Sequence, residues 1–121
     1  MNKLTFLIIS MALIGCANQR PAWKDNVLSE QEAIYRLNLC KEKKYPQIED
    51  NQSSAYTVAL ALSVQCRAAR NDLIAAVASQ SPDPDTTYTN MMHDSQDPAK
   101  STDAYLPYVL GARNADPQVK P

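Results

Sequence analysis

The sequence predicts an all-α protein: a small helical hairpin or bundle pinned by one disulfide, between a disordered N-terminal tether and a disordered C-terminal tail. Three observations predict this class. Residues 16–121 contain a single glycine and no phenylalanine, whereas a β-rich fold needs turn glycines and aromatic side chains. Two segments between residues 29 and 79 have helical hydrophobic periodicity. Each of these segments holds one cysteine, Cys40 in the first and Cys66 in the second.

The first 16 residues, MNKLTFLIISMALIGC, have the pattern of an export signal. Lys3 supplies a positive charge, residues 4–13 are almost entirely apolar, and Leu13-Ile14-Gly15-Cys16 follows. The apolar run is shorter than the roughly 17–25 residues of a membrane-spanning helix, and its flanks are those of a cleavable signal. Leu13-Ile14-Gly15-Cys16 resembles the lipobox of bacterial lipoproteins.

This resemblance implies that residues 1–15 are removed and that Cys16 carries a diacylglyceryl group, in many bacteria with a further acyl chain such as palmitate on its amino group. It implies a location in the cell envelope, anchored to a membrane by lipid and facing the periplasm. In lipoproteins, an aspartate directly after the lipidated cysteine favours retention at the inner membrane. Ala17 occupies that position here, so the resemblance implies the outer membrane. The alternatives are ordinary secretion with cleavage after Ala17, and an uncleaved anchor.

Residues 16–28 are predicted to form the lipidated tether, and residues 29–79 the helical hairpin. Trp23 either rests at the membrane interface or caps the helical core. The first helix is predicted over residues 29–44. Ser29 and Glu32 have the spacing of a capping box, and Tyr45-Pro46 is predicted to end the helix.

The second helix is predicted over residues 53–79, after a connection of residues 45–52. Its best signal is a seam of small and apolar residues with alternating spacings of four and three. The seam consists of Ala55, Ala59, Leu62, Cys66, Ala69, Leu73 and Ala76. No charged residue lies between Asp50 and Arg67, so the helix needs cover on more than one side. Either a second protein covers it, or it is the buried helix of a small bundle.

Cys40 and Cys66 are predicted to form one intramolecular disulfide in an oxidising compartment. In a tight hairpin with these helix ends the two cysteines are misaligned by about eight residues, or about 12 Å. The bridge therefore requires a packed connection. A mixed disulfide with a partner and two unpaired thiols are the alternatives.

Residues 80–121 are rich in proline and aspartate, and we expect them to be a largely disordered tail. One apolar island, residues 104–110, interrupts this composition. It is either a docking segment that orders on a partner or a segment that folds back onto the second helix. Its candidate contact residues are Tyr105, Leu106, Tyr108, Val109 and Leu110.

The sequence offers little catalytic or metal-binding chemistry. Met91-Met92-His93-Asp94 has the ligand types that copper prefers, but four contiguous residues in a flexible segment rarely complete a coordination sphere, so we expect no metal site. The pairs Glu49-Asp50 and Asp83-Asp85 are interpreted as turn and solvation residues. The formal charge of −1 does not indicate a nucleic-acid partner. We expect a protein that is not an enzyme and has no cofactor.

The predicted function is therefore that of a non-catalytic, lipid-anchored interaction protein, an accessory or assembly subunit of a secretion or conjugation machine. Its second helix would contact an envelope protein or a second copy through Ala55, Ala59, Leu62, Ala69 and Leu73. The alternatives are an inhibitor lipoprotein and a periplasmic binder of a metal or small ligand. A weaker resemblance, carried by Cys40-Lys41, Pro46 and Cys66-Arg67-Ala68-Ala69, is to conjugative entry-exclusion lipoproteins.

Overall fold

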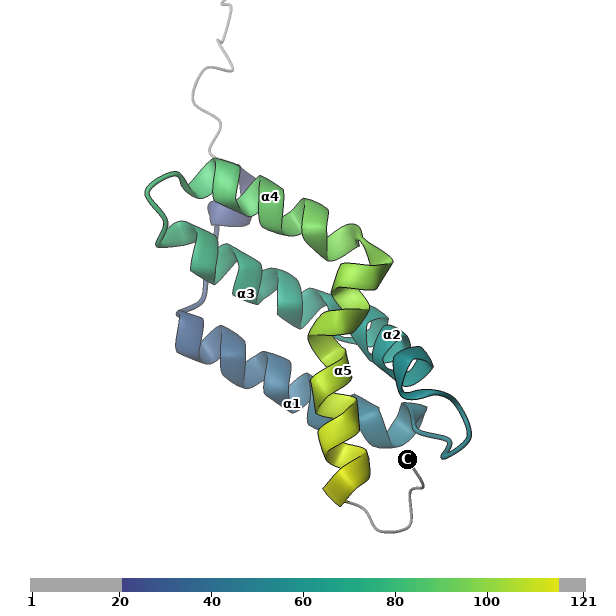
Figure 1. The fold of residues 1–121 in the computed structure, drawn as a ribbon. Coiled ribbons are helices and arrows are strands. Elements are labelled where there is room, and N and C mark those ends of the chain that lie inside the picture. The colour runs from purple at the N-terminus through teal and green to yellow at the C-terminus, as the bar shows by residue number, and fades with distance from the viewer. Residues whose placement is uncertain (1–20, 116–121) are drawn as a thin grey trace, which may run out of the picture.

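The computed structural model describes residues 21–115, which form one short 3-10 turn and five α-helices and contain no β-strand. The elements are η1 (Ala22–Lys24), α1 (Glu30–Ile48), α2 (Ala55–Gln65), α3 (Arg67–Ser79), α4 (Pro84–Gln96) and α5 (Pro98–Ala115). Helices α1, α3 and α4 lie side by side in that order, and α5 packs across α2 (Figure 1). The predicted all-α class is confirmed. The predicted signal peptide and Cys16 lie outside the described residues.

Helix α1 begins where the sequence predicts and ends later. The Ser29 hydroxyl accepts a hydrogen bond from the Glu32 amide at 3.2 Å, as in a capping box. The Glu32 carboxylate instead accepts from Arg36 at 2.8 Å. The helix then continues through Pro46, which was predicted to end it. Tyr45 and Ile48 pack against the hydrophobic core, and this packing offsets the hydrogen bond that proline cannot donate.

The predicted second helix is two helices with a break at Cys66. Ser54 caps α2, since its hydroxyl accepts from the Thr57 amide at 3.1 Å. Cys66 leaves helical geometry, with φ −101° and ψ 18°, although its amide still donates to the Leu62 carbonyl at 2.9 Å. Helix α3 ends at Ser79, as predicted. The break turns α3 away from α2, so the two halves of the predicted seam meet different neighbours.

The predicted disulfide between Cys40 and Cys66 is confirmed, with 5.8 Å between the two Cα atoms. The longer α1 explains how the two cysteines meet. Cys40 lies eight residues before the end of α1, and Cys66 lies eleven residues after the start of α2. The cysteines are therefore nearly level, and the bridge ties the middle of α1 to the break between α2 and α3.

Most of the predicted disordered tail is helical, which corrects that prediction for residues 84–115. The carboxylates of Asp83 and Asp97 each accept backbone amides of the following turn. Pro84 and Pro98 are the first residues of α4 and α5. Proline is favoured at this position because the amide it lacks would have no partner inside the helix. Each Asp-Pro pair therefore starts a helix instead of preventing one.

Helix α5 folds back onto α2, so the second alternative for residues 104–110 is the one observed. Tyr105 and Val109 are buried in the main core. Leu106 and Tyr108 pack against that core from its edge. The other buried members of the core are Val58, Ala59, Leu62 and Cys66.

Part of the segment predicted as a tether packs against α4. The Trp23 ring stacks on the Tyr88 ring, with 4.3 Å between the centroids and 4° between the planes. The Lys24 ammonium lies 3.0 Å from the Asp85 carboxylate. Trp23 thus packs on the helical domain at Tyr88 of α4 and not on the main core that it was predicted to cap as one of two alternatives. Among the helices of residues 21–115, none is long and apolar enough to cross a bilayer.

Candidate interaction surfaces

The predicted contact residues mostly hold the fold together. Ala59 and Leu62 of the seam, and Tyr105 and Val109 of the tail segment, are at most 3% exposed. The two predicted contact surfaces pack against each other across the α2–α5 interface, so these four side chains have no free surface for a partner. Ala55, Ala69, Leu73, Leu106 and Tyr108 are half-buried, and Leu110 is exposed.

The outer face of α2 is apolar and uncovered. Tyr56, Leu60 and Val64 are spaced four residues apart and are 46%, 37% and 51% exposed. This α2 stripe continues into a groove of about 410 Å³ that Arg67 and Met92 also line. Arg67 is exposed, and it forms no ion pair with any residue that the structure places. The surface is therefore an apolar strip that ends at a positive charge.

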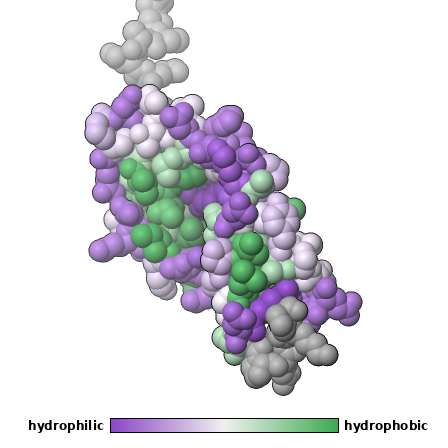
Figure 2. All heavy atoms as spheres, viewed as in Figure 1, coloured by the Kyte–Doolittle hydropathy of each residue, from purple (hydrophilic) through white to green (hydrophobic). Residues whose placement is uncertain are grey.

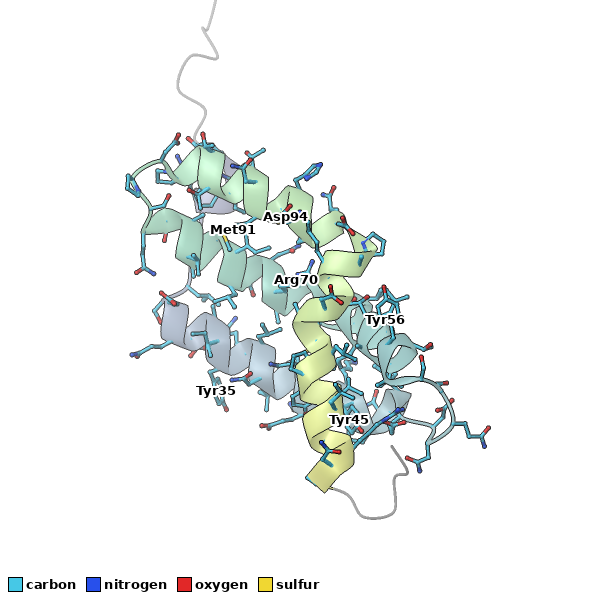
Figure 3. The ribbon with its side chains drawn as sticks, viewed as in Figure 1. Tyr35, Tyr45, Tyr56, Arg70, Met91 and Asp94 are labelled. Atoms are coloured by element: carbon cyan, nitrogen blue, oxygen red, sulfur yellow. A yellow bond between two sulfur atoms is a disulfide. The ribbon has the colours of Figure 1, made fainter. Side chains whose placement is uncertain are left out.

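A second surface is a hollow of about 380 Å³ bounded by α3, α4 and α5. Its apolar wall comes from Leu73, Ile74 and Val77 of α3, Met91 of α4 and Ala104 of α5. Figure 2 shows a hydrophobic patch over α3 between α1 and α4, with hydrophilic residues around it. In Figure 3, Met91 lies between α4 and α3.

Arg70 lies in this hollow where α3 meets α5 (Figure 3). Its guanidinium donates hydrogen bonds to the Ser101 hydroxyl and the Ser95 carbonyl oxygen. It lies 5.9 Å from the centre of the Tyr105 ring. Within residues 21–115 no carboxylate pairs with Arg70, and its buried Nε has no acceptor. Arg70 is therefore a half-buried cation whose charge no acidic residue neutralises.

The other two charged residues that line the hollow neutralise each other. The Lys100 ammonium lies 2.6 Å from the Asp94 carboxylate. This contact lowers the pKa of Asp94 below its ordinary value and raises the pKa of Lys100 above its own. The charged lining of the hollow, Arg70 with Asp94 and Lys100, therefore has a net charge of +1.

A buried ion pair, which the sequence did not predict, joins the C-terminal end of α5 to the C-terminal end of α1. Arg113 donates two hydrogen bonds of 2.8 Å to Glu49, and the two side chains are 8% and 7% exposed. The Tyr45 hydroxyl donates to the same carboxylate at 2.7 Å. The bonds from Arg113 hold the pKa of Glu49 down at about 2, and burial raises the pKa of Tyr45 to about 12.

The interpretation of Glu49 as a solvated turn residue is therefore wrong. Its neighbour Asp50 is a turn residue as predicted, because its carboxylate accepts from the amides of Gln52 and Ser53. Glu49 and Arg113 are 64 residues apart, and no spacing rule connects them. The one available signal is that Glu49 follows apolar Ile48 at the end of a core helix.

Met91, Met92, His93 and Asp94 lie on consecutive positions of α4 and so point in different directions. The His93 side chain is 86% exposed. In the part of the chain that the structure describes, no three His, Cys, Asp or Glu side chains are grouped as a metal site would require. The described surface offers apolar side chains beside arginines without a carboxylate partner, and these are components of a binding surface.

The chain matches no protein-family model, no curated protein and no solved structure.

Proposed function

We propose that this chain is a lipid-anchored, non-catalytic protein of the cell envelope that binds another envelope protein. The observation that carries the proposal is the lipobox-like sequence Leu13-Ile14-Gly15-Cys16, which follows an export signal. The Cys40–Cys66 disulfide supports it, because disulfides form and persist in oxidising compartments such as the periplasm. Ala17 favours anchoring to the outer membrane.

The state of the reactive side chains supports a non-catalytic role. Both described cysteines are joined in the disulfide. The side chain of His93, the one histidine of the chain, is 86% exposed, and its Nδ1 lies 3.9 Å from the carboxylate of the adjacent Asp94, a solvated setting that does not hold a base in a fixed position. Glu49 is held ionised by Arg113. These cysteines, His93 and Glu49 therefore do not form a catalytic set of a nucleophile, a base and a residue that orients the base.

The α2 stripe is the surface that we assign to the partner. Tyr56, Leu60 and Val64 offer aromatic and aliphatic contacts, and Arg67 offers an unpaired positive charge one turn further. The complementary partner presents an apolar face with a carboxylate at one end. An accessory subunit of a secretion or conjugation machine would use the stripe in this way, with Cys16 holding it at the membrane.

Lipidation is tested by expressing the full chain in a Gram-negative bacterium that is fed an alkyne analogue of palmitate. We expect the processed protein to carry the label and to partition into the detergent phase. The Cys16→Ser variant should lose both properties. The double variant Cys40→Ser, Cys66→Ser is the matched control, since it keeps Cys16 and should remain labelled. An unlabelled protein of processed mass would contradict the lipid anchor and favour ordinary secretion.

Partner binding is tested by placing a photo-crosslinking amino acid at Leu60 in the intact bacterium. The matched position is Lys43, which is exposed on α1. We expect one adduct from position 60, none from position 43, and loss of the adduct when Val64→Asp is added. Adducts of equal yield from both positions would overturn the assignment of α2. An adduct with twice the mass of the chain would show that α2 binds a second copy instead.

A further inference from the structure

We propose that the hollow between α3, α4 and α5 binds a single-chain aliphatic carboxylate, a molecule of the fatty-acid class, with Arg70 holding its head group. The hollow adjoins the groove beside the α2 stripe, since Ser95 and Ser101 line both, but its apolar wall and Arg70 belong to the hollow alone. The proposal does not depend on the lipid anchor at Cys16. Three features of the hollow carry the proposal: its apolar wall, its uncompensated cation and its size.

The apolar wall provides the binding site for the chain of the ligand. Leu73, Ile74 and Val77 form one side, and Met91 faces them from α4. Unbranched methionine adapts its shape to a flexible ligand. Burial of aliphatic carbon against such a wall is favourable because it removes apolar surface from water. The volume of about 380 Å³ lies within the range of roughly 300–1,000 Å³ that is typical of small-molecule sites.

Arg70 determines the charge of the ligand. It is partly removed from water, and its present acceptors are a hydroxyl and a carbonyl oxygen, neither of which carries a charge. A guanidinium forms its strongest hydrogen bonds with a carboxylate, often as a pair. Because Asp94 and Lys100 neutralise each other, the net charge of +1 matches a monoanion.

The position of Arg70 matches an amphiphile and not a small polar anion. The α3 side of the apolar wall begins one turn beyond Arg70 with Leu73 and Ile74, and Val77 follows on the next turn of the same helix. A head group at Arg70 therefore places an attached chain along Leu73 and Val77 towards Met91. Acetate would reach the cation and leave the wall uncovered.

The test uses the full chain as it is isolated from the expressing bacterium, and a decanoic acid that carries a photoreactive diazirine in its chain. After irradiation, labelled peptides are mapped by mass spectrometry, and unlabelled decanoate is added as a competitor. We expect labelling to be concentrated on the peptides that contain Leu73 and Met91 and to be displaced by decanoate. Acetate and decanol should displace it at least about tenfold less effectively, because each lacks one part of the recognised ligand.

Arg70→Gln is the first variant, and Arg67→Gln is its matched control, because both remove one positive charge from α3. We expect the half-saturating probe concentration to rise by about tenfold in Arg70→Gln and to stay unchanged in Arg67→Gln. Circular dichroism of the same samples reports whether each variant is folded. If Arg70→Gln is unfolded, Ala104→Trp decides the question, since it fills the mouth of the hollow without removing the bonds of Arg70.

Three results would overturn the proposal. The first is labelling spread over the exposed apolar residues, including the α2 stripe, with no preference for the hollow. The second is equal affinity for decanoate and decanol, or an unchanged affinity in folded Arg70→Gln. The third is that Leu73 and Met91 crosslink to a protein in the intact cell while the fatty-acid probe does not label them. In that last case the hollow is a protein-docking surface.

Discussion

The two ends of this helical domain are held together by different means. At the α2–α5 end, a disulfide, a buried Arg113–Glu49 pair and a core containing Leu62, Tyr105 and Val109 join three helices. At the α3–α4 end, α4 has no fully buried residue. A Trp23–Tyr88 stack, the hydrogen bonds of Arg70 and the buried α3 residues Ile74, Ala76 and Ala78 hold that end. The α2–α5 end has a large buried core and presents its free apolar surface on the outer face of α2, whereas the other end has the hollow with the unpaired cation.

The difference suggests a division of roles within about 95 described residues. Fixing the middle of α1 to the α2–α3 break allows α4 to lie on the domain without contributing to its main core. A helix with few buried contacts opens more readily than its neighbours. We therefore expect α4 to be the element whose position responds to ligands. Four predictions test the comparison between the two ends.

The largest expected effect is that of Arg113→Met, which removes one partner of the buried ion pair. The Glu49 carboxylate, 7% exposed, is then left without its cation. Breaking a buried pair in this way costs about 3–5 kcal/mol. We expect the free energy of unfolding, measured by urea denaturation, to fall by that amount. Lys43→Met, an exposed position of the same charge, is the control and should change it by less than about 0.5 kcal/mol.

Acid tests the same pair without a substitution. The folded-state pKa of Glu49 is lowered from 4.5 to about 2, so its contribution to stability is complete above pH 4.5 and is lost as the pH falls towards 2. Urea denaturation at a series of pH values should show this loss. It should be smaller in Glu49→Gln, which has no proton to gain. An identical acid profile for both proteins would contradict the assignment.

The next largest effect is expected from removing the Cys40–Cys66 disulfide. Removing a cross-link between residues 26 positions apart costs roughly 3–4 kcal/mol on the chain-entropy model. We expect the double variant Cys40→Ser, Cys66→Ser to lose that much stability, and reduction of the parent protein to have the same effect. The reductant should not change the unfolding of the double variant. Hydrogen exchange should show increased opening first at the α1 and α2 amides near the bridge.

The smallest expected effect is that of Trp23→Ala, which removes the stack on Tyr88. A stacked aromatic pair contributes about 0.5–1.5 kcal/mol beyond its buried area. We expect faster hydrogen exchange across α4 and a global stability change of about 1–2 kcal/mol. Tyr35→Ala, at a tyrosine that is 59% exposed on α1, is the control and should leave α4 unchanged. Faster exchange in α2 and α5 would contradict the division into two ends.

The sequence predicted the helices whose ends have short-range signals and missed those whose signals were ambiguous. Ser29 and Ser54 cap the helices that were predicted to begin there. The proline-rich and aspartate-rich composition of residues 80–121 predicts disorder, although the Asp83-Pro84 and Asp97-Pro98 pairs within it are favourable at the start of a helix. Composition could not distinguish these cases. For α5, helix formation is favoured by the burial of Tyr105 and Val109 in the core, about two and three turns after Pro98.

The candidate surfaces were harder to predict than the fold. The apolar spacing of α2 correctly indicated a helix that needs cover, but it could not show that α5 of the same chain supplies it. The hollow and the Arg113–Glu49 pair join residues from different helices. Both depend on long-range packing, which short-range periodicity does not encode. The Cys40–Cys66 bridge was predictable because an even pair of cysteines is expected to form a disulfide wherever the compartment is oxidising.

The stacking of Trp23 on Tyr88 also has a spectroscopic consequence. The chain has a single tryptophan, so its fluorescence comes from one known position. Trp23 belongs to η1, and its ring packs on Tyr88 of α4, away from the α2–α5 core. Tryptophan fluorescence therefore reports whether the segment before α1 is packed against α4. Far-ultraviolet circular dichroism follows the helices as a whole, so together the two signals record separately the release of this segment and the unfolding of the domain.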